Sequence, residues 1–368
     1  MDLQFLLERF SEPTILVGGG LLVGLVFGAF AQQSRFCLRA AAIEFTHGKA
    51  GPKLAVWLLA FSAAVLGTQL LIAFDLASLG EARQLASPQS LAGAAIGGVM
   101  FGCGMILSRG CASRLLVLSA TGNLRALLSG LVFAVVAQAS LRGILEPSRA
   151  WIASTLTTSD IGGNDLLAFL GMSRTVAIAL ALMWLAAGIW VAVRCRAGIW
   201  RSVSALGVGL AIPLAWWFTD SMSHQAFDPV QVEGVTFTGP SADTLMLFLS
   251  PPGTMLDFDV GLVPGVFLGS FLAALLTREL EIQGFKDGPS MRRYLLGAAL
   301  MGFGGMLAGG CAVGAGVTGA SVIALTAWVT LSAIWLSAAI TDRLVDGGPQ
   351  AARAAGVAGV AGGMPVQP

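Results

Sequence analysis

Three cysteines in this sequence follow apolar runs and stand in short segments rich in small residues. They are Cys37 in SRFCLRA, Cys111 in SRGCASR and Cys311 in GGCAVGAG. Glycine lets a chain turn sharply and approach a ligand, and the N-terminus of a following helix presents unpaired N–H groups with the positive end of the helix dipole. The natural guest of such a turn is an anion, with the thiols placed beside it.

Two of the three cysteine segments are copies of each other. Residues 97–112 and 297–312 are identical at seven of 16 aligned positions, including Gly-Cys-Ala, and residues 27–37 match 101–111 at Phe, Gly, Ser, Arg and Cys. The three cysteines therefore occupy equivalent positions, which favours a shared role over three unrelated ones. We expect them to line a substrate path together with four small neighbours, which are Gly110, Gly310, Ala112 and Ala312.

The alternative for each of these residues is structural. Glycine-rich spans pack helices closely, and cysteine is a common small buried residue. We assign that structural role to Cys103, whose repeat partner is Phe303, and to Cys195, which stands between two arginines.

Two arginines precede a cysteine by two residues. Arg35 and Arg109 can attract an anion toward the thiols, or they can reach lipid phosphates and mark a membrane boundary. The sequence leaves both readings open. Gly309 takes the arginine's place in the third segment, as expected if that segment enters from the opposite membrane face.

The elements that must position these cysteines are membrane spans. Hydrophobic residues make up 56% of the chain and charged residues 11%, with a mean hydropathy of +0.81, whereas about a quarter of the residues of a soluble domain are charged. The sequence predicts an all-α polytopic membrane protein embedded in a lipid bilayer. The nine expected spans lie near 14–32, 54–73, 91–107, 125–145, 174–194, 203–218, 261–277, 293–307 and 321–340. The first follows an acidic segment and is expected to be a retained span rather than a signal peptide.

Charge predicts the orientation of these spans. With the N-terminus outside, the inner connections hold 16 of the 21 basic residues, as the positive-inside rule requires. Acidic residues crowd the 219–260 connection, which we place outside. Nine spans then leave the C-terminus in the cytoplasm, and the expected location is the bacterial inner membrane.

On this topology the spans before Cys111 and Cys311 run in opposite directions, so the repeat is inverted. We expect one transport domain over 1–346, with repeat one at about 14–145, a linker span at 174–194 and repeat two at about 203–340. Residues 347–368 form a low-complexity tail predicted to be disordered. Inverted repeats place the substrate path at their interface. The residues after both cysteines are expected to form brief re-entrant helices, which are tolerated only inside the protein or along a cavity.

Several classes of protein are excluded by what the sequence lacks. The five cysteines form no CxxC pair, and His47 and His224 have no second ligand nearby, so we expect no metal and no cofactor. Asp75, Asp220 and Asp342 stand at span ends rather than mid-span. No nucleotide-binding motif is present, and we expect neither an enzyme nor a nucleic-acid partner.

The segments SRFCLRA, GCGMILSRGCASR and GGMLAGGCAVGAGVTG resemble the cysteine motifs of the YeeE/YedE family of bacterial thiosulfate uptake proteins, and the resemblance covers almost the whole chain. It implies an hourglass of spanning and re-entrant helices with inverted pseudo-symmetry. It also implies thiosulfate import through three central thiols, carried onto Cys37, Cys111 and Cys311, and a cytoplasmic sulfurtransferase-like partner.

The chemistry of thiosulfate suits such a site. Its sulfonate end fits backbone N–H groups and helix dipoles, and its soft terminal sulfur can accept weak S–H hydrogen bonds. Neutral thiols are favoured beside an anion in an apolar constriction, so we expect relay by S–H contacts rather than covalent transfer. Two rivals remain: a carrier of a selenium compound or another sulfur anion, and a membrane thiol oxidoreductase.

Overall fold

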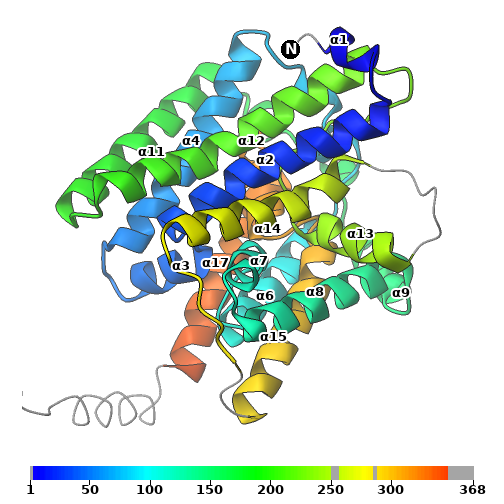
Figure 1. Ribbon diagram of the computed structural model, residues 1–368. Helices are drawn as coiled ribbons and strands as arrows, with labels where there is room; N and C mark the ends of the chain where they lie inside the picture. The colour runs from blue at the N-terminus through cyan, green and yellow to red at the C-terminus, as the bar shows by residue number, and fades with distance from the viewer. Residues whose placement is uncertain (1–2, 250–256, 285–287, 347–368) are drawn as a thin grey trace, which may run out of the picture.

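The computed structural model describes residues 3–249, 257–284 and 288–346, and this part of the chain folds into helices (Figure 1). Within these ranges nine helical segments are long and apolar enough to cross a membrane, which confirms the predicted number. Their principal helices are α2 (Glu12–Ser34), α4 (Pro52–Ala73), α6 (Leu91–Leu107), α8 (Leu124–Arg142), α11 (Arg174–Arg194), α12 (Ile199–Gln225), α14 (Phe258–Leu276), α15 (Gly288–Leu307) and α17 (Leu325–Val345). The tail predicted to be disordered, 347–368, lies outside the described residues.

Short elements fill the connections. The short elements that follow the three cysteines are α3 (Leu38–Thr46), α7 (Ala112–Ala120), η3 (Ala312–Thr318) and α16 (Gly319–Ser321). A further short helix, α13 (Thr238–Leu249), precedes α14. The brief helices expected after Cys111 and Cys311 are therefore present as α7 and as the π-helical turn η3 with α16. The remaining short elements are α1 (Gln4–Leu7), η1 (Leu79–Glu81), α5 (Arg83–Ala86), α9 (Glu146–Ala153), η2 (Thr158–Ile161) and α10 (Leu166–Leu170).

Helices α2 and α14 run in the same direction and touch through glycines, and Figure 1 shows them side by side. A methyl group on Gly20, Gly24 or Gly28 of α2 would collide with backbone of α14. Gly261, Gly265 and Gly269 of α14 stand equally close to the backbone of α2. Small residues allow this close approach of two backbones, which is a common basis of helix packing in membranes.

Helices α6 and α15, which lead to Cys111 and Cys311, are antiparallel. Gly97 packs against Gly304, and Gly104 packs against Gly297, so the start of each helix lies beside the end of the other. The two cysteines consequently follow opposite ends of this helix pair. We call these two ends of the molecule the Cys111 end and the Cys311 end.

The packing partners of the long helices fall into matched pairs. Helix α6 packs on α17, and in the same way α15, which matches α6, packs on α8. Helix α2 packs on α14, and in the same way α12, which matches α2, packs on α4. The short helices follow the same scheme, since α3 contacts α4 and α17 while α13 contacts α14 and α8. Helix α11 packs on α4 and stands outside these pairs.

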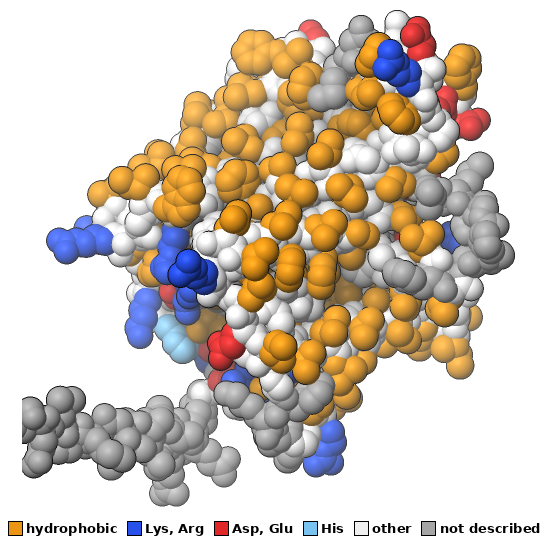
Figure 2. Space-filling model, viewed as in Figure 1, with side chains coloured by type: hydrophobic (Ala, Val, Ile, Leu, Met, Phe, Trp, Pro, Cys, Tyr) orange, Lys and Arg blue, Asp and Glu red, His pale blue; other side chains and the backbone are white. Residues whose placement is uncertain are grey.

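The surface is apolar over a broad middle zone. Figure 2 shows hydrophobic side chains covering this zone, with most of the visible basic side chains gathered toward one end. Exposed apolar side chains on the long helices include Leu182, Trp190, Leu275 and Leu336. Contiguous apolar surface of this extent requires a membrane around it, and the protein is a multi-pass membrane protein.

Candidate functional site

Each of the three predicted cysteines stands immediately before a short helix, at its N-cap. Their sulfur atoms face the amide of the third residue on, which is Ala40, Arg114 or Gly314 respectively. The Gly314 N–H donates to Sγ of Cys311 at 3.4 Å. A sulfur that accepts from the helix keeps its S–H free to donate to another group.

The structure brings two of the predicted thiols together. Cys37 and Cys111 interact directly through their side chains, although 74 positions separate them in the sequence. Cys111 is 1% exposed, Cys37 is partly buried, and Ser113 Oγ lies 3.4 Å from Cys111 Sγ. The Cys111 end of the molecule therefore holds a buried pair of thiols.

At the Cys311 end the third thiol has a hydroxyl neighbour instead of a second thiol. Thr238 lies beside the thiol of Cys311, and the backbone amide of Phe237 also faces this sulfur. The hydroxyl of Thr236 is buried without a hydrogen-bond partner in the described part of the chain, and the buried hydroxyl of Thr238 has no partner there besides the Cys311 thiol. Both hydroxyls could donate to a polar guest beside Cys311.

The segment that carries these threonines is held in place by side-chain hydrogen bonds. The Thr219 hydroxyl of α12 donates to the Glu233 carbonyl oxygen at 2.8 Å, and Thr318 of η3 donates to the Val235 carbonyl oxygen at 2.6 Å. Trp216 Nε1 donates to Ser321 Oγ at 3.2 Å. The segment is thereby fixed between a long helix and the turn that follows Cys311.

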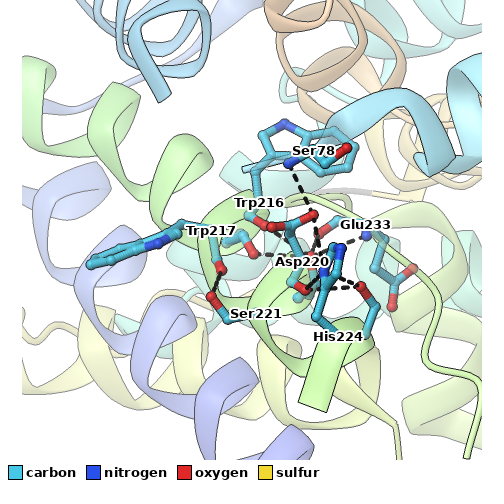
Figure 3. A network of polar contacts seen from close by, with 10 residues as sticks. Ser78, Trp216, Trp217, Asp220, Ser221, His224 and Glu233 are labelled. Atoms are coloured by element: carbon cyan, nitrogen blue, oxygen red, sulfur yellow. Dashed lines mark hydrogen bonds and ion pairs between the residues drawn. The ribbon is translucent and has the colours of Figure 1, made fainter. Parts of the chain in front are cut away.

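The end of α12 differs from the sequence prediction. The expected span stops near 218, with Asp220 assigned to an outer connection, whereas α12 continues to Gln225. Figure 3 shows why this polar turn stays helical: Asp220 accepts a hydrogen bond from the Ser78 N–H at 3.1 Å and lies 3.7 Å from His224 Nδ1. Hydropathy marks such a turn as a loop, but its polar groups are satisfied by neighbours.

Three phenylalanines connect the two thiol sites. Phe36 immediately precedes Cys37, and Phe237 immediately precedes Thr238. The ring of Phe27 on α2, which is 0% exposed, lies 6.5 Å from the Phe36 ring and 5.1 Å from the Phe237 ring between centroids. An apolar layer therefore separates the thiol pair from the hydroxyls beside Cys311.

The predicted arginines lie at the surface of the Cys111 end. Arg35 and Arg109 are exposed, with φ of 56° and 58°, and Arg35 pairs with Glu279 at 3.2 Å. Each occupies the left-handed position that ends its helix, and Gly309 holds the same position with φ of 74°. Glycine adopts this conformation without strain, which accounts for Gly309 on conformational grounds alone. Neither predicted arginine is buried beside the thiols.

The small residues of the predicted loops are buried. Gly110 and Gly310 are enclosed, and Ala112 and Ala312 are 6% and 2% exposed. A methyl group on Gly310 would come within 2.6 Å of the Ala315 nitrogen, so glycine is needed there for the turn. This geometry explains the small residues by packing and leaves their contact with substrate as a prediction.

The other two cysteines have ordinary partners. Cys103 Sγ accepts a hydrogen bond from Thr341 at 3.2 Å, and the Cys195 thiol lies 3.7 Å from the Ala192 carbonyl oxygen. Burial raises the pKa of the Cys195 thiol above its usual value.

Neither the two histidines nor an apolar cavity in the helix bundle suggests further chemistry. His47 pairs with Asp342 at 3.0 Å, and within the described residues no group of three or more His, Cys, Asp and Glu side chains is arranged to hold a metal ion. A cavity of about 200 Å³ lies between α7, α8, α13 and α14. Its walls are almost entirely apolar, with Leu116, Leu131 and Phe267 among them, so it does not suit an anion.

The sequence analysis missed the residues around Cys311 that come from the 232–238 segment. A weak signal exists, because SRFCLRAA (34–41) aligns with VTFTGPSA (235–242) at Phe36 and Phe237, which places Thr238 opposite Cys37. Two identities in eight positions are too few to find this match without the structure. The sequence analysis also passed over Arg114, which follows Cys111 by three residues.

Comparison with known proteins bears on the function of this arrangement. The sequence pattern of the family described as "Sulphur transport" matches residues 33–340, a range that includes Cys37, Cys111 and Cys311. The thiosulfate transporter TsuA of Escherichia coli (strain K12) is 26% identical over 358 residues, covering 91% of this chain and 96% of that protein. The thiosulfate transporter TsuA of Spirochaeta thermophila is 27% identical over 332 residues, covering 85% of this chain and 94% of its own.

Proposed function

The chain belongs to the Sulphur transport family, a transporter family rather than an enzyme family, and from this premise we propose that it carries thiosulfate across the membrane along a path formed by Cys37, Cys111 and Cys311. One observation supports this most directly. All three sulfur atoms stand at the N-caps of short helices inside the protein, where S–H groups can donate to an anion that helix dipoles attract.

An inverted repeat accounts for the packing of the helices. The contacts described above are preserved when α2, α4, α6 and α8 are exchanged with α12, α14, α15 and α17. The antiparallel packing of α6 on α15 and the matched environments of α3 and α13 support the same exchange. In this proposal the two halves enclose the path in an hourglass shape, with the phenylalanine layer at its waist.

The transfer of thiosulfate needs no covalent step. At the Cys311 end the thiol and the hydroxyls of Thr236 and Thr238 receive the ion, and at the Cys111 end the thiol pair receives it after the apolar layer. Each thiol donates its S–H to the terminal sulfur or to a sulfonate oxygen and stays neutral. Sulfate lacks the soft terminal sulfur, so a row of thiols would select thiosulfate over it.

Charge assigns a direction to this path. In the bacterial inner membrane with an outer N-terminus, the Cys311 end faces outside and the basic Cys111 end faces the cytoplasm. Import then proceeds from Cys311 to the thiol pair, and a cytoplasmic sulfurtransferase-like protein would accept the ion. A selenium compound or another sulfur anion remains the second candidate substrate, because thiols offer the same contacts to each.

Uptake of radiolabelled thiosulfate into vesicles that contain only this protein tests the proposal. Cys37→Ser, Cys111→Ser and Cys311→Ser retain the helix cap, because serine is a favoured N-cap residue, yet they replace the soft donor. We expect each to lose most of the uptake while the protein remains folded. Full uptake by Cys111→Ser combined with Cys311→Ser would refute the thiol path, and stronger competition by a selenium compound than by unlabelled thiosulfate would favour the second substrate.

A further inference from the structure

Arg114 is a partly buried cation beside the thiol pair. It stands in the first turn of α7, three residues after Cys111, and its Nη1 atom is buried without a hydrogen-bond partner in the described part of the chain. Its guanidinium acts electrostatically on both Cys37 and Cys111. The backbone of Arg114 also faces the Cys111 sulfur, which places this residue at the thiol pair.

Acidic side chains at this end are already engaged by other groups. Glu279 accepts from Arg35 at 3.2 Å through one carboxylate oxygen and from Gln32 at 2.9 Å through the other. Asp346 pairs with Arg293 at 3.0 Å and with Arg39 at 3.7 Å. Among the described residues, no carboxylate lies within ion-pair distance of Arg114.

An unpaired guanidinium in such a place is unfavourable for the empty protein. Withdrawing part of a guanidinium from water without a counter-ion is unfavourable, and an arriving anion would remove part of that cost. Arginine also presents a planar fork of donors that matches the oxygens of an oxyanion. The structure thus places an unpaired cation beside two thiols, where it could bind an anion.

The equivalent position at the other end has no charge. Gly314 occupies the place of Arg114 in the Cys311 motif, and the Thr236 side chain packs against it. The cationic group is therefore specific to the Cys111 end and does not follow from the repeat.

We propose that Arg114 binds the sulfonate oxygens of thiosulfate while Cys37 and Cys111 contact its terminal sulfur. Arg114 would thereby make the thiol pair a retention site for sulfur oxyanions at the end of the path. This inference rests on the proposed function, because it assigns a binding residue to the sulfonate end of thiosulfate.

The test uses Arg114→Gln and Arg114→Lys in the full-length protein, with Arg194→Gln as the matched control. Arg194 is exposed at the end of α11 and packs over Trp190. Purified protein in detergent is heated with and without sodium thiosulfate, and the same variants are assayed for uptake in vesicles.

We expect Arg114→Gln to raise the KM for thiosulfate by about 10- to 150-fold, the range for a lost charge-assisted hydrogen bond. Its melting temperature without thiosulfate should equal or exceed that of the unaltered protein, because a partly buried charge without a counter-ion has been removed. The stabilisation by thiosulfate should be lost. Arg114→Lys should recover part of both effects, and Arg194→Gln should behave like the unaltered protein.

Two results would overturn the inference. An Arg114→Gln protein that keeps its KM and its thiosulfate-induced stabilisation would refute anion binding by Arg114 while leaving the transport function intact. A melting temperature that falls without thiosulfate, with stabilisation by thiosulfate retained, would show a structural role instead. If the unaltered protein shows neither uptake nor stabilisation, the proposed function fails, and the inference fails with it.

Discussion

The hydroxyl of Thr238 offers the sharpest test of the Cys311 end. It is buried beside the Cys311 thiol, has no nitrogen or oxygen hydrogen-bond partner in the described structure, and packs against Gly305. Thr238→Val replaces this hydroxyl with a methyl group and keeps the shape of the side chain. The substitution therefore separates packing from hydrogen bonding.

The two effects of Thr238→Val should have opposite signs. A buried polar group without a partner costs about 1–3 kcal/mol, so the valine variant should be as stable as the unaltered protein or more stable by up to that amount. If the hydroxyl donates to the bound anion, its loss removes a neutral hydrogen bond of about 0.5–1.5 kcal/mol. That loss corresponds to a KM for thiosulfate that is about 2- to 12-fold higher.

The assay combines vesicle uptake across a range of thiosulfate concentrations with thermal unfolding of the purified protein. Thr238→Cys serves as the companion variant, because it places a thiol where Cys37 stands at the other end and should sustain uptake. The reasoning is refuted if Thr238→Val leaves the KM unchanged, or if it unfolds at a lower temperature and lowers only the maximal uptake rate, in proportion to lost protein.

Phe27→Ala should open the apolar layer, allow vesicles to admit more sulfate relative to thiosulfate, and cost about 3–5 kcal/mol of stability; unchanged selectivity in a folded variant would argue against a barrier there. Burial raises the pKa of Glu233 to about 7 from 4.5, against the nearby charge of Arg83. The folded protein therefore holds the proton of the Glu233 carboxyl more tightly than the unfolded chain does. The contribution of this proton to stability is complete below pH 4.5 and is lost as the pH rises to about 7. Glu233→Gln should flatten the decline in melting temperature over this pH range, and an unaltered slope would contradict the assignment. Cys103→Ala and Cys195→Ala should each retain most uptake, because both thiols have partners away from the path; loss of uptake by either in a folded variant would extend the path beyond the three thiols.

Hydropathy predicted the nine spans because contact with lipid requires long apolar helices, and the residues of such a helix are consecutive in the sequence. Repeat spacing predicted equivalent positions for Cys37, Cys111 and Cys311, and each stands at the N-cap of a short helix. The contact of Cys37 with Cys111 could not be predicted in this way, because it depends on how separate helices pack.

Two further features were hidden for different physical reasons. The polar last turn of α12 is helical because partners such as Ser78 satisfy it, and hydropathy carries no record of partners. Arg114 was overlooked because an arginine near a span end usually reaches water or lipid phosphate. Only the burial of its Nη1 atom and the engagement of Glu279 by other groups distinguish it.

The glycine contacts between α2 and α14 restrict how this protein can move. These helices belong to different halves of the proposed repeat, yet their backbones touch along much of their length through Gly20, Gly24 and Gly28. Carriers that work by alternating access rock one half against the other, and such rocking would break the glycine contacts between α2 and α14. We therefore expect the scaffold to stay fixed during a transport cycle, with movement confined to thiol rotamers, the Phe27 ring and the short helices. The kinetics should then resemble those of a gated channel more than those of a rocking carrier.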